Sequence, residues 1–320
     1  MKKIILVAGD PNSINSELIY KCWKKINNSI KNKIYLIANY NLILKQFKQL
    51  KYSIKIVKVK NIHKNDKNNK LKIIDIDLKF KNSFKVSDEA ASKYIRKSLT
   101  YAHKLALENS DSGIINCAIN KNLLNRNNTG VTEFLAAKCN VKNNSEVMLI
   151  ANEELSVSPI TTHINIKQVS SQIKSISIIN KVKTIDLWFQ KKFKKKPKIG
   201  ILGLNPHNAE FKKKSEEMRT IIPSIIRLKK LGFRVKGPLV SDTVFINDYK
   251  NYDVIIGMFH DQVLTPFKAL FKFNAINITL GLKYLRISPD HGTASDLIGK
   301  NKADPTSLLK CIGYVSKYKE

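Results

Sequence analysis

The stretch at residues 253–268 constrains the fold most, because it joins an apolar run to polar, chemically active side chains. The apolar run at 254–256 stops at Gly257, and His260 follows almost at once, with an aspartate and a glutamine after it. A short run of this kind predicts a buried strand of a parallel sheet, here over residues 253–257. In open α/β sheets, ligands bind just past the carboxyl ends of strands. We therefore expect His260 to lie in a functional site.

Two further histidines, His163 and His207, also follow short apolar runs. Imidazole is a common ligand of zinc-like metals, and a catalytic site uses three protein ligands and leaves one position open. The three histidines are too far apart in sequence for a zinc finger, so they would have to meet through the fold. The spacing leaves open the alternative of three unrelated strand-end histidines that form local hydrogen bonds.

Alternating strands and helices predict a mostly parallel α/β architecture, and 320 residues suffice for two lobes. The expected strands lie at 3–8, 34–38, 113–119, 147–151, 157–162, 199–204, 253–257 and 275–281. The expected helices lie at 87–108, 130–137, 166–193, 215–231 and 304–316, and polar loops are expected at 64–70 and 125–129. The sequence has no P-loop and no Gly-x-Gly-x-x-Gly fingerprint.

The net charge of +32 raises the possibility of nucleic-acid binding. Only six of the 57 basic residues are arginine, however, and base reading and bidentate phosphate contacts favour arginine. The lysines are spread along the chain, which is typical of a solvated surface. Nucleic-acid binding therefore remains only a distant alternative, although the positive field could attract an anionic substrate.

The cysteines and the apolar segments favour a cytoplasmic protein. Four widely separated cysteines indicate neither a disulfide framework nor a cysteine zinc site; they are Cys22, Cys117, Cys139 and Cys311. No apolar stretch approaches the length that crosses a bilayer, so no membrane association is expected. The apolar run at 4–8 is too short for a signal peptide, and we interpret it as a first strand.

Eight short motifs occur in one order along the chain. They are Gly9-Asp-Pro, Ile119-Asn-Lys, Thr132-Glu-Phe-Leu-Ala, Thr161-Thr-His-Ile, Gly203-Leu-Asn-Pro-His, Gly237-Pro-Leu with Ser241-Asp-Thr, Phe259-His-Asp-Gln, and Asn277-Ile-Thr-Leu-Gly-Leu through Ser288-Pro-Asp-His-Gly-Thr-Ala. From residue 5 to about 308, the chain thereby resembles the 4-hydroxythreonine-4-phosphate dehydrogenase family of pyridoxal phosphate biosynthesis. The loop at 290–301 also resembles the cofactor loop of isopropylmalate and isocitrate dehydrogenases, which share the family's general fold.

The resemblance implies two α/β/α lobes with mostly parallel sheets and an active-site cleft between them. The first lobe would comprise residues 1–125 and 275–320, with the cofactor loop at 290–301. The second would comprise residues 126–274, with the metal-binding histidines and the dimerisation surface. The resemblance also implies a homodimer whose partner subunit completes each site, a small phosphorylated substrate, NAD or NADP, and one divalent metal ion (Zn, Mg, Co or Mn).

The resemblance assigns roles to individual residues. The metal ligands would be His163, His207 and His260, and the substrate contacts Thr132, Lys268, Asn277 and Arg286. The cofactor contacts would be His291, Gly292, Thr293 and Ala294. The sequence does not single out a general base: Asp242 and Asp261 are candidates, and either could instead orient a ligand histidine.

The chain departs from the family pattern at a few positions. Val131 replaces the histidine of the family's Gly-His-Thr-Glu motif, which removes one imidazole that contacts the substrate. The family also has glycines in the stretches aligned with 12–15 and 208–210, and one at Asn301.

The reaction implied by the resemblance is NAD(P)-dependent oxidation of 4-phosphooxy-L-threonine to 2-amino-3-oxo-4-phosphooxybutanoate. That product decarboxylates to 3-amino-2-oxopropyl phosphate. Because of Val131, a related dehydrogenase of D-threonate or D-erythronate 4-phosphate is the alternative. A phosphate-ester hydrolase is a weaker option, because the sequence shows no paired-carboxylate two-metal site.

Overall fold

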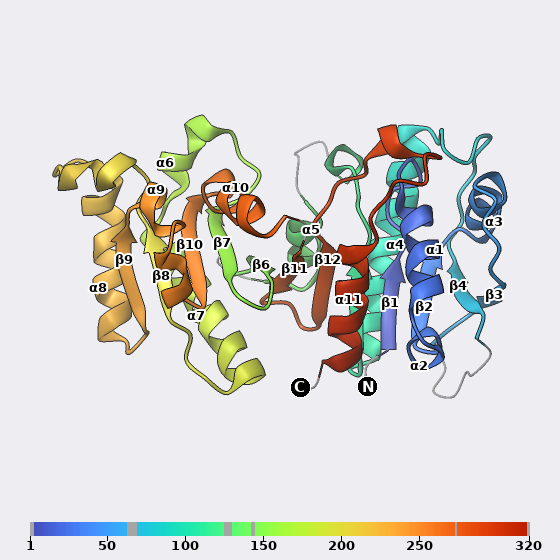
Figure 1. Cartoon of the computed structure of the whole chain (residues 1–320), viewed down its shortest axis with the longest axis horizontal. Coiled ribbons are helices and arrows are strands. Elements are labelled where there is room, and N and C mark those ends of the chain that lie inside the picture. Colours follow the sequence, from blue (N-terminus) through green and yellow to red (C-terminus); the bar gives the residue numbers. More distant parts are fainter. Residues whose placement is uncertain (1–2, 63–68, 125–129, 142–144, 273, 319–320) are drawn as a thin grey trace. The chain divides into compact units, whose positions relative to one another are not determined.

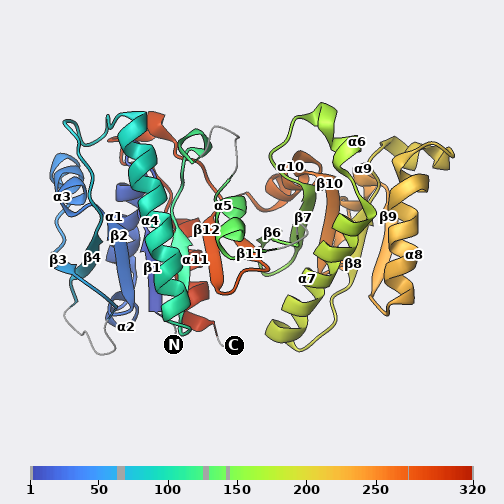
Figure 2. The ribbon, with the colours of Figure 1, turned by 180° about the vertical axis from the view of Figure 1, so that it is seen from behind.

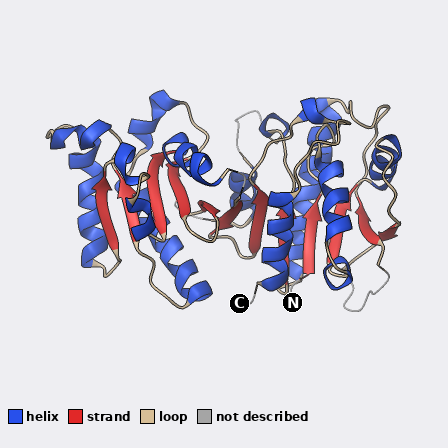
Figure 3. Cartoon of the chain, viewed as in Figure 1, coloured by secondary structure: helices blue, strands red, loops and turns tan. Residues whose placement is uncertain are grey.

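The apolar runs form strands and the amphipathic stretches between them form helices (Figures 1 and 3). The structure, a computed structural model, describes residues 3–62, 69–124, 130–141, 145–272 and 274–318. The loop predicted at 125–129 and most of the one predicted at 64–70 lie outside the described residues. The chain divides into unit 1, residues 1–138 with 283–319, and unit 2, residues 139–282. The sequence-based prediction placed these boundaries near residues 126 and 274.

Unit 1 is built on a wholly parallel sheet with the strand order β3-β4-β2-β1-β5-β12. Its strands are β1 (Lys3–Val7), β2 (Ile34–Ala38), β3 (Ile56–Val59), β4 (Leu71–Asp75), β5 (Ser112–Asn116) and β12 (Leu285–Pro289). Its helices are α1 (Asn15–Lys25), α2 (Asn28–Lys31), α3 (Tyr40–Gln49), α4 (Asp88–Glu108), α5 (Val131–Lys138) and α11 (Thr306–Lys317). Helices α1 and α11 pack together on one face and α4 covers the other, as the opposite views in Figures 1 and 2 show.

Unit 2 is built on a mixed sheet with the strand order β11-β6-β7-β10-β8-β9. Its strands are β6 (Val147–Ala151), β7 (Ser156–Thr161), β8 (Ile199–Leu202), β9 (Val235–Leu239), β10 (Val254–Phe259) and β11 (Ile276–Leu280). Strand β6 is antiparallel to both β11 and β7, whereas β7, β10, β8 and β9 are parallel. Its helices are α6 (Val169–Gln172), α7 (Ser175–Phe193), α8 (Ile222–Lys230), α9 (Ser241–Val244) and α10 (His260–Phe271), with α7 and α10 on opposite faces (Figures 1 and 2).

The fold class is the predicted one, but two predicted helices are interrupted. The helix expected over 166–193 is broken at Ile173 and Lys174, whose backbone is extended between α6 and α7. Ile173 is buried, so its apolar character reflects contact with the core rather than a position on one continuous helix. The helix expected over 215–231 begins as a π-helical turn at Glu217–Ile221, and α8 follows with Pro223, which has no N–H to donate, in its first turn. Within the described residues, no helix is long and apolar enough to cross a membrane.

Candidate active site

The junction of β10 and α10 positions His260. The strand continues through Gly257 to Phe259, so the prediction that it ends at Gly257 was wrong. The glycine allows a close approach of the helix instead: a Cβ atom at Gly257 would lie 2.6 Å from Cγ1 of Val263. His260 is the first residue of α10, at the carboxyl end of a buried strand, where the sequence predicts a functional side chain.

His163 lies next to His260 because β7 and β10 are parallel neighbours. Phe259 is paired with Thr161, and the Thr161 hydroxyl donates a 2.7 Å hydrogen bond to the carbonyl of Met258. The centroids of the two imidazole rings are 5.6 Å apart. Two imidazoles on one tetrahedral zinc ion would have centroids roughly 5 Å apart, given Zn–N distances near 2.0–2.1 Å. The pair therefore fits two ligands of one metal ion.

Asp261 fixes the ring of His260. Nδ1 of His260 and Oδ1 of Asp261 are 2.6 Å apart, which leaves Nε2 as the ring nitrogen suited to a metal. A carboxylate on the second imidazole nitrogen orients a ligand histidine and raises its basicity. Asp242, the other candidate base, lies in α9 with an exposed side chain.

His207 does not complete a three-histidine group in the structure. Among the described residues, no cluster of three or more His, Cys, Asp and Glu side chains has a geometry that could hold a metal ion. His207 is exposed and begins a left-handed turn at 207–211, in which every residue has a positive φ between 48° and 57°.

Two polar residues to which the sequence analysis assigned no role, Glu217 and Gln262, hold the segments around the histidines. Glu217 is buried and accepts hydrogen bonds from the N–H groups of Leu204 and Asn205, both at 2.8 Å. Burial would raise the pKa of Glu217, but these hydrogen bonds hold it below its ordinary value. Gln262 donates to the carbonyl of Gly203 (2.7 Å) and accepts from the N–H of Met258 (2.6 Å), so it links the ends of β8 and β10.

Unit 1 brings together two predicted substrate-binding residues. Arg286 in β12 is only 2% exposed, and its Nε donates a 2.7 Å hydrogen bond to Oδ1 of Asn116. Its Nη1 donates a 3.2 Å hydrogen bond to the hydroxyl of Thr132, the residue that follows Val131 at the start of α5. Burial lowers the pKa of the Arg286 guanidinium to about 10, so it remains charged at neutral pH. Asn116 was missed because a buried asparagine at a strand end has no distinctive sequence signal.

The other two predicted substrate-binding residues belong to unit 2. Lys268 is half-buried in the last turn of α10. Asn277 lies in β11, and its Oδ1 is buried without a hydrogen-bond partner among the described residues. A buried amide oxygen in this state favours a ligand or water that donates to it.

The predicted cofactor residues form the loop that follows β12. The carbonyl of Thr293 accepts a 3.2 Å hydrogen bond from the N–H of Ile14, just before α1. Nδ1 of His291 lies 2.9 Å from the carbonyl of Gly292, and Ala294 adopts a left-handed conformation with φ 43°. The loop is therefore joined to the segment that opens α1.

A family model described as "Pyridoxal phosphate biosynthetic protein PdxA" matches residues 29–315. The chain belongs to the PdxA family. Two PdxA relatives named 4-hydroxythreonine-4-phosphate dehydrogenase are similar over nearly their whole length. The one from Sulfurihydrogenibium sp. is 36% identical, covering 98% of this chain and 97% of the relative. The one from Aquifex aeolicus is 38% identical, covering 97% and 96%.

A solved PdxA-family structure agrees with these relatives. The crystal structure of 4-hydroxythreonine-4-phosphate dehydrogenase from Klebsiella pneumoniae has a TM-score of 0.83 and 26% identity, covering 99% of both chains. These comparisons confirm the family, the α/β fold class and the dehydrogenase class that the eight motifs predict.

Proposed function

We propose that this PdxA-family protein oxidises 4-phosphooxy-L-threonine with NAD or NADP. The product, 2-amino-3-oxo-4-phosphooxybutanoate, then decarboxylates to 3-amino-2-oxopropyl phosphate in the synthesis of pyridoxal 5′-phosphate. The names of the relatives support the substrate. The observation that carries the chemistry is the pairing of His163 with His260, whose ring Asp261 orients.

We assign one divalent metal ion (Zn, Mg, Co or Mn) to His163, His207 and His260. When bound, such an ion supplies a Lewis acid that makes the substrate hydroxyl more acidic. The adjoining rings of His163 and His260 support two of the three ligands. His207 as third ligand stays a prediction, as does a homodimer whose partner subunit completes each site.

The chain's own polar groups would bind and orient the substrate and cofactor. We assign the phosphate and carboxylate of the substrate to Thr132, Lys268, Asn277 and Arg286, since a cation fixed by hydrogen bonds is well suited to an anion. The loop at 291–294 would bind the nicotinamide cofactor. Asp261 is best placed to orient His260, which leaves Asp242 as the candidate base. A cytoplasmic location also stays a prediction.

Val131 favours a second candidate within the same enzyme class. It stands where the family has a histidine, beside the buried Thr132 that contacts Arg286. A valine cannot donate a hydrogen bond to a substrate group, so the preferred acid could be D-threonate or D-erythronate 4-phosphate. Comparing turnover of the three phosphorylated acids would separate the two candidates.

The first test is NADH formation at 340 nm from 4-phosphooxy-L-threonine and NAD⁺, with a divalent metal and with or without chelator. We expect turnover that the chelator abolishes. If folded, metal-loaded protein does not oxidise 4-phosphooxy-L-threonine, the related phosphorylated acids would become the proposed substrates. If those also fail, salt-dependent nucleic-acid binding would be the function to test.

A histidine variant tests the metal assignment directly. We expect His207→Ala to lose metal-dependent turnover and to lower the bound metal measured by elemental analysis. His103→Gln is the matched control, because His103 is a half-buried histidine of α4 whose Nδ1 lies 2.8 Å from the Tyr284 hydroxyl. Normal activity and metal content in His207→Ala would refute the three-histidine site.

A further inference from the structure

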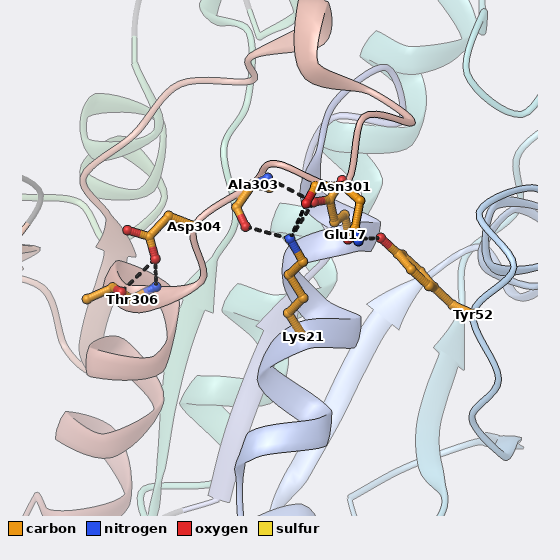
Figure 4. Close-up of polar contacts among 7 residues, drawn as sticks. All are labelled: Glu17, Lys21, Tyr52, Asn301, Ala303, Asp304 and Thr306. Carbon is orange, nitrogen blue, oxygen red and sulfur yellow. Dashed lines mark hydrogen bonds and ion pairs between the residues drawn. The ribbon is translucent and has the colours of Figure 1, made fainter.

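Two charged residues of α1 bind the main chain at the end of the cofactor loop (Figure 4). Glu17 and Lys21 lie one helical turn apart, and Nζ of Lys21 is 2.7 Å from Oε1 of Glu17. The Glu17 side chain is 1% exposed and that of Lys21 is 22% exposed. An exposed ion pair at this spacing contributes little to the stability of a protein. Here the glutamate side chain is buried, and its geometry is fixed.

All three donors of the Lys21 ammonium group are used. Besides Glu17, Nζ donates to the carbonyl oxygens of Asn301 (3.0 Å) and Ala303 (2.9 Å). Glu17 Oε1 also accepts the N–H of Ala303 at 2.8 Å. A lysine ammonium has three N–H groups, so this arrangement saturates it. The pair therefore holds the main chain of residues 301–303 at three points, independently of the side chains there.

Tyr52 holds the same segment from another side. Its hydroxyl donates a 3.0 Å hydrogen bond to Oδ1 of Asn301, and its ring stacks on Tyr20 with centroids 4.0 Å apart. Asn301 has a φ of 55°, the left-handed region that asparagine tolerates better than most residues. Asn301 thus keeps the backbone conformation suited to the family's glycine and adds a side-chain contact.

Asn301 of the held segment, together with Ile298 and Gly299 just before it, forms one wall of a cavity of about 600 Å³ in unit 1. Its lining includes Lys51, Tyr52, Phe84, Lys85, Ile298 and Asn301. Two lysines suit phosphate groups, and aromatic side chains suit a flat ring. None of the described residues that line the cavity has a carboxylate side chain. Its volume lies in the range of small-molecule sites.

We propose that Glu17 and Lys21 are positioning residues that hold the 298–303 segment so that this cavity receives the nucleotide part of the dinucleotide cofactor. This inference rests on the proposed function. A wall that is fixed before binding lowers the entropic cost of ordering it when the nucleotide binds. Without the pair, the nucleotide should bind more weakly, while hydride transfer from bound substrate should be nearly unchanged.

The test compares Glu17→Gln and Lys21→Met with the wild-type protein. Calorimetry with ADP and with NAD⁺ measures nucleotide affinity, and steady-state kinetics measure kcat and both KM values. We expect Kd for ADP and NAD⁺, and KM for NAD⁺, to rise about tenfold. We expect kcat and KM for the phosphorylated acid to stay within about twofold.

The chain offers a matched control pair on α4. Lys93 and Glu89 have the same spacing and the same 2.7 Å distance, but their side chains are 72% and 79% exposed. Glu89→Gln and Lys93→Met should leave every one of these constants unchanged. Hydrogen exchange without nucleotide should be faster at 298–303 in Glu17→Gln and Lys21→Met and unaltered in the controls.

The outcomes separate the inference from the proposed function. Wild-type protein that binds neither NAD⁺ nor ADP overturns both. If Glu17→Gln and Lys21→Met bind NAD⁺ and ADP as tightly as the wild-type protein does, the inference alone is overturned. A loss of kcat as large as the loss of nucleotide affinity also overturns the inference alone. If both variants fail to fold, Tyr52→Phe still tests whether the 298–303 segment must be held. This variant removes the hydroxyl that donates to Asn301 and should weaken ADP binding about threefold. Unchanged ADP binding would contradict the proposal.

Discussion

Single residues in the left-handed region carry strain near the predicted site. His207, Asn208 and Ala209 open the left-handed turn, and such a conformation costs an ordinary residue about 1–2 kcal/mol. Side-chain contacts offset part of this cost: Asn208 donates to the carbonyl of Pro238, and Glu217 holds the preceding backbone. Strain of this kind persists where the surrounding structure fixes the backbone, often at functional sites.

Ala209 offers a direct measurement of that strain. Its φ is 51°, so Ala209→Gly removes a Cβ atom from an unfavourable conformation. Glycine also gains entropy in the unfolded chain, which reduces the benefit. We expect the free energy of unfolding to rise by up to about 1 kcal/mol in urea denaturation. A clear decrease would mean that the turn is not left-handed in solution.

The hydrogen bonds of Asp304 predict that the free energy of unfolding depends on pH. The hydroxyl and N–H of Thr306 donate to its Oδ1 at 2.6 and 2.9 Å and hold the pKa of Asp304 below its ordinary value (Figure 4). Its stabilising contribution is therefore complete above the unfolded pKa of about 3.9 and is lost as the pH falls through the folded pKa. We expect Asp304→Asn to lower the free energy of unfolding at about pH 7 by less than about 1 kcal/mol, because the group is exposed, and to have a smaller effect as the pH falls through the folded pKa. A constant difference across this range would show that the charge is not responsible.

At the scale of elements, the contact between β10 and α10 determines where His260 lies. Gly257→Ala would place a methyl group 2.6 Å from Val263, and overpacking of this kind costs about 1–3 kcal/mol. We expect a lower melting temperature and weaker metal binding, since α10 must shift. Gly313→Ala is the control, because an added Cβ at Gly313 in α11 would meet no described atom within 4 Å other than those of its chain neighbours and its own helix backbone. Alanine should stabilise that helix by about 0.5–1 kcal/mol.

Local sequence patterns determine some elements and not others. The helix predicted at 87–108 forms almost as expected, because its apolar positions keep one spacing throughout. The long helix predicted at 166–193 is broken, because a buried Ile173 fits an apolar pattern equally well in an extended segment.

In the candidate site, too, some residues could be predicted from local sequence patterns and others could not. The strand-end rule predicted positions for His163 and His260 that the structure brings together. Glu217 and Gln262 act through main-chain groups of other segments, and Asn116 acts on Arg286, which lies 170 positions away. Contacts of this kind depend on the fold and leave no local pattern.

At the scale of the whole molecule, the net charge of +32 predicts weak binding of polyanions. We expect duplex DNA to bind at low ionic strength and to inhibit turnover by competing with the anionic substrate. Both effects should disappear between about 50 and 200 mM salt, because such binding is driven by counterion release. Turnover assays and fluorescence anisotropy with labelled DNA would measure this, and DNA binding that survives physiological salt would strengthen the nucleic-acid alternative.

The chain order of the two units sets the order in which they can be completed during translation. Unit 2 is continuous in sequence, whereas the sheet of unit 1 needs β12 beside β5, and α11 packs on β12 and β1. At typical synthesis rates of about 5–20 residues per second, β12 leaves the ribosome roughly 10–30 s after β5. Unit 1, which would bind the cofactor, therefore cannot complete its sheet until unit 2, which would bind the metal, has been synthesised. Until then, one edge of β5 remains unpaired. A nascent chain stalled when residue 282, but not β12, has left the ribosome should accordingly contain a protease-resistant unit 2 and a protease-sensitive unit 1.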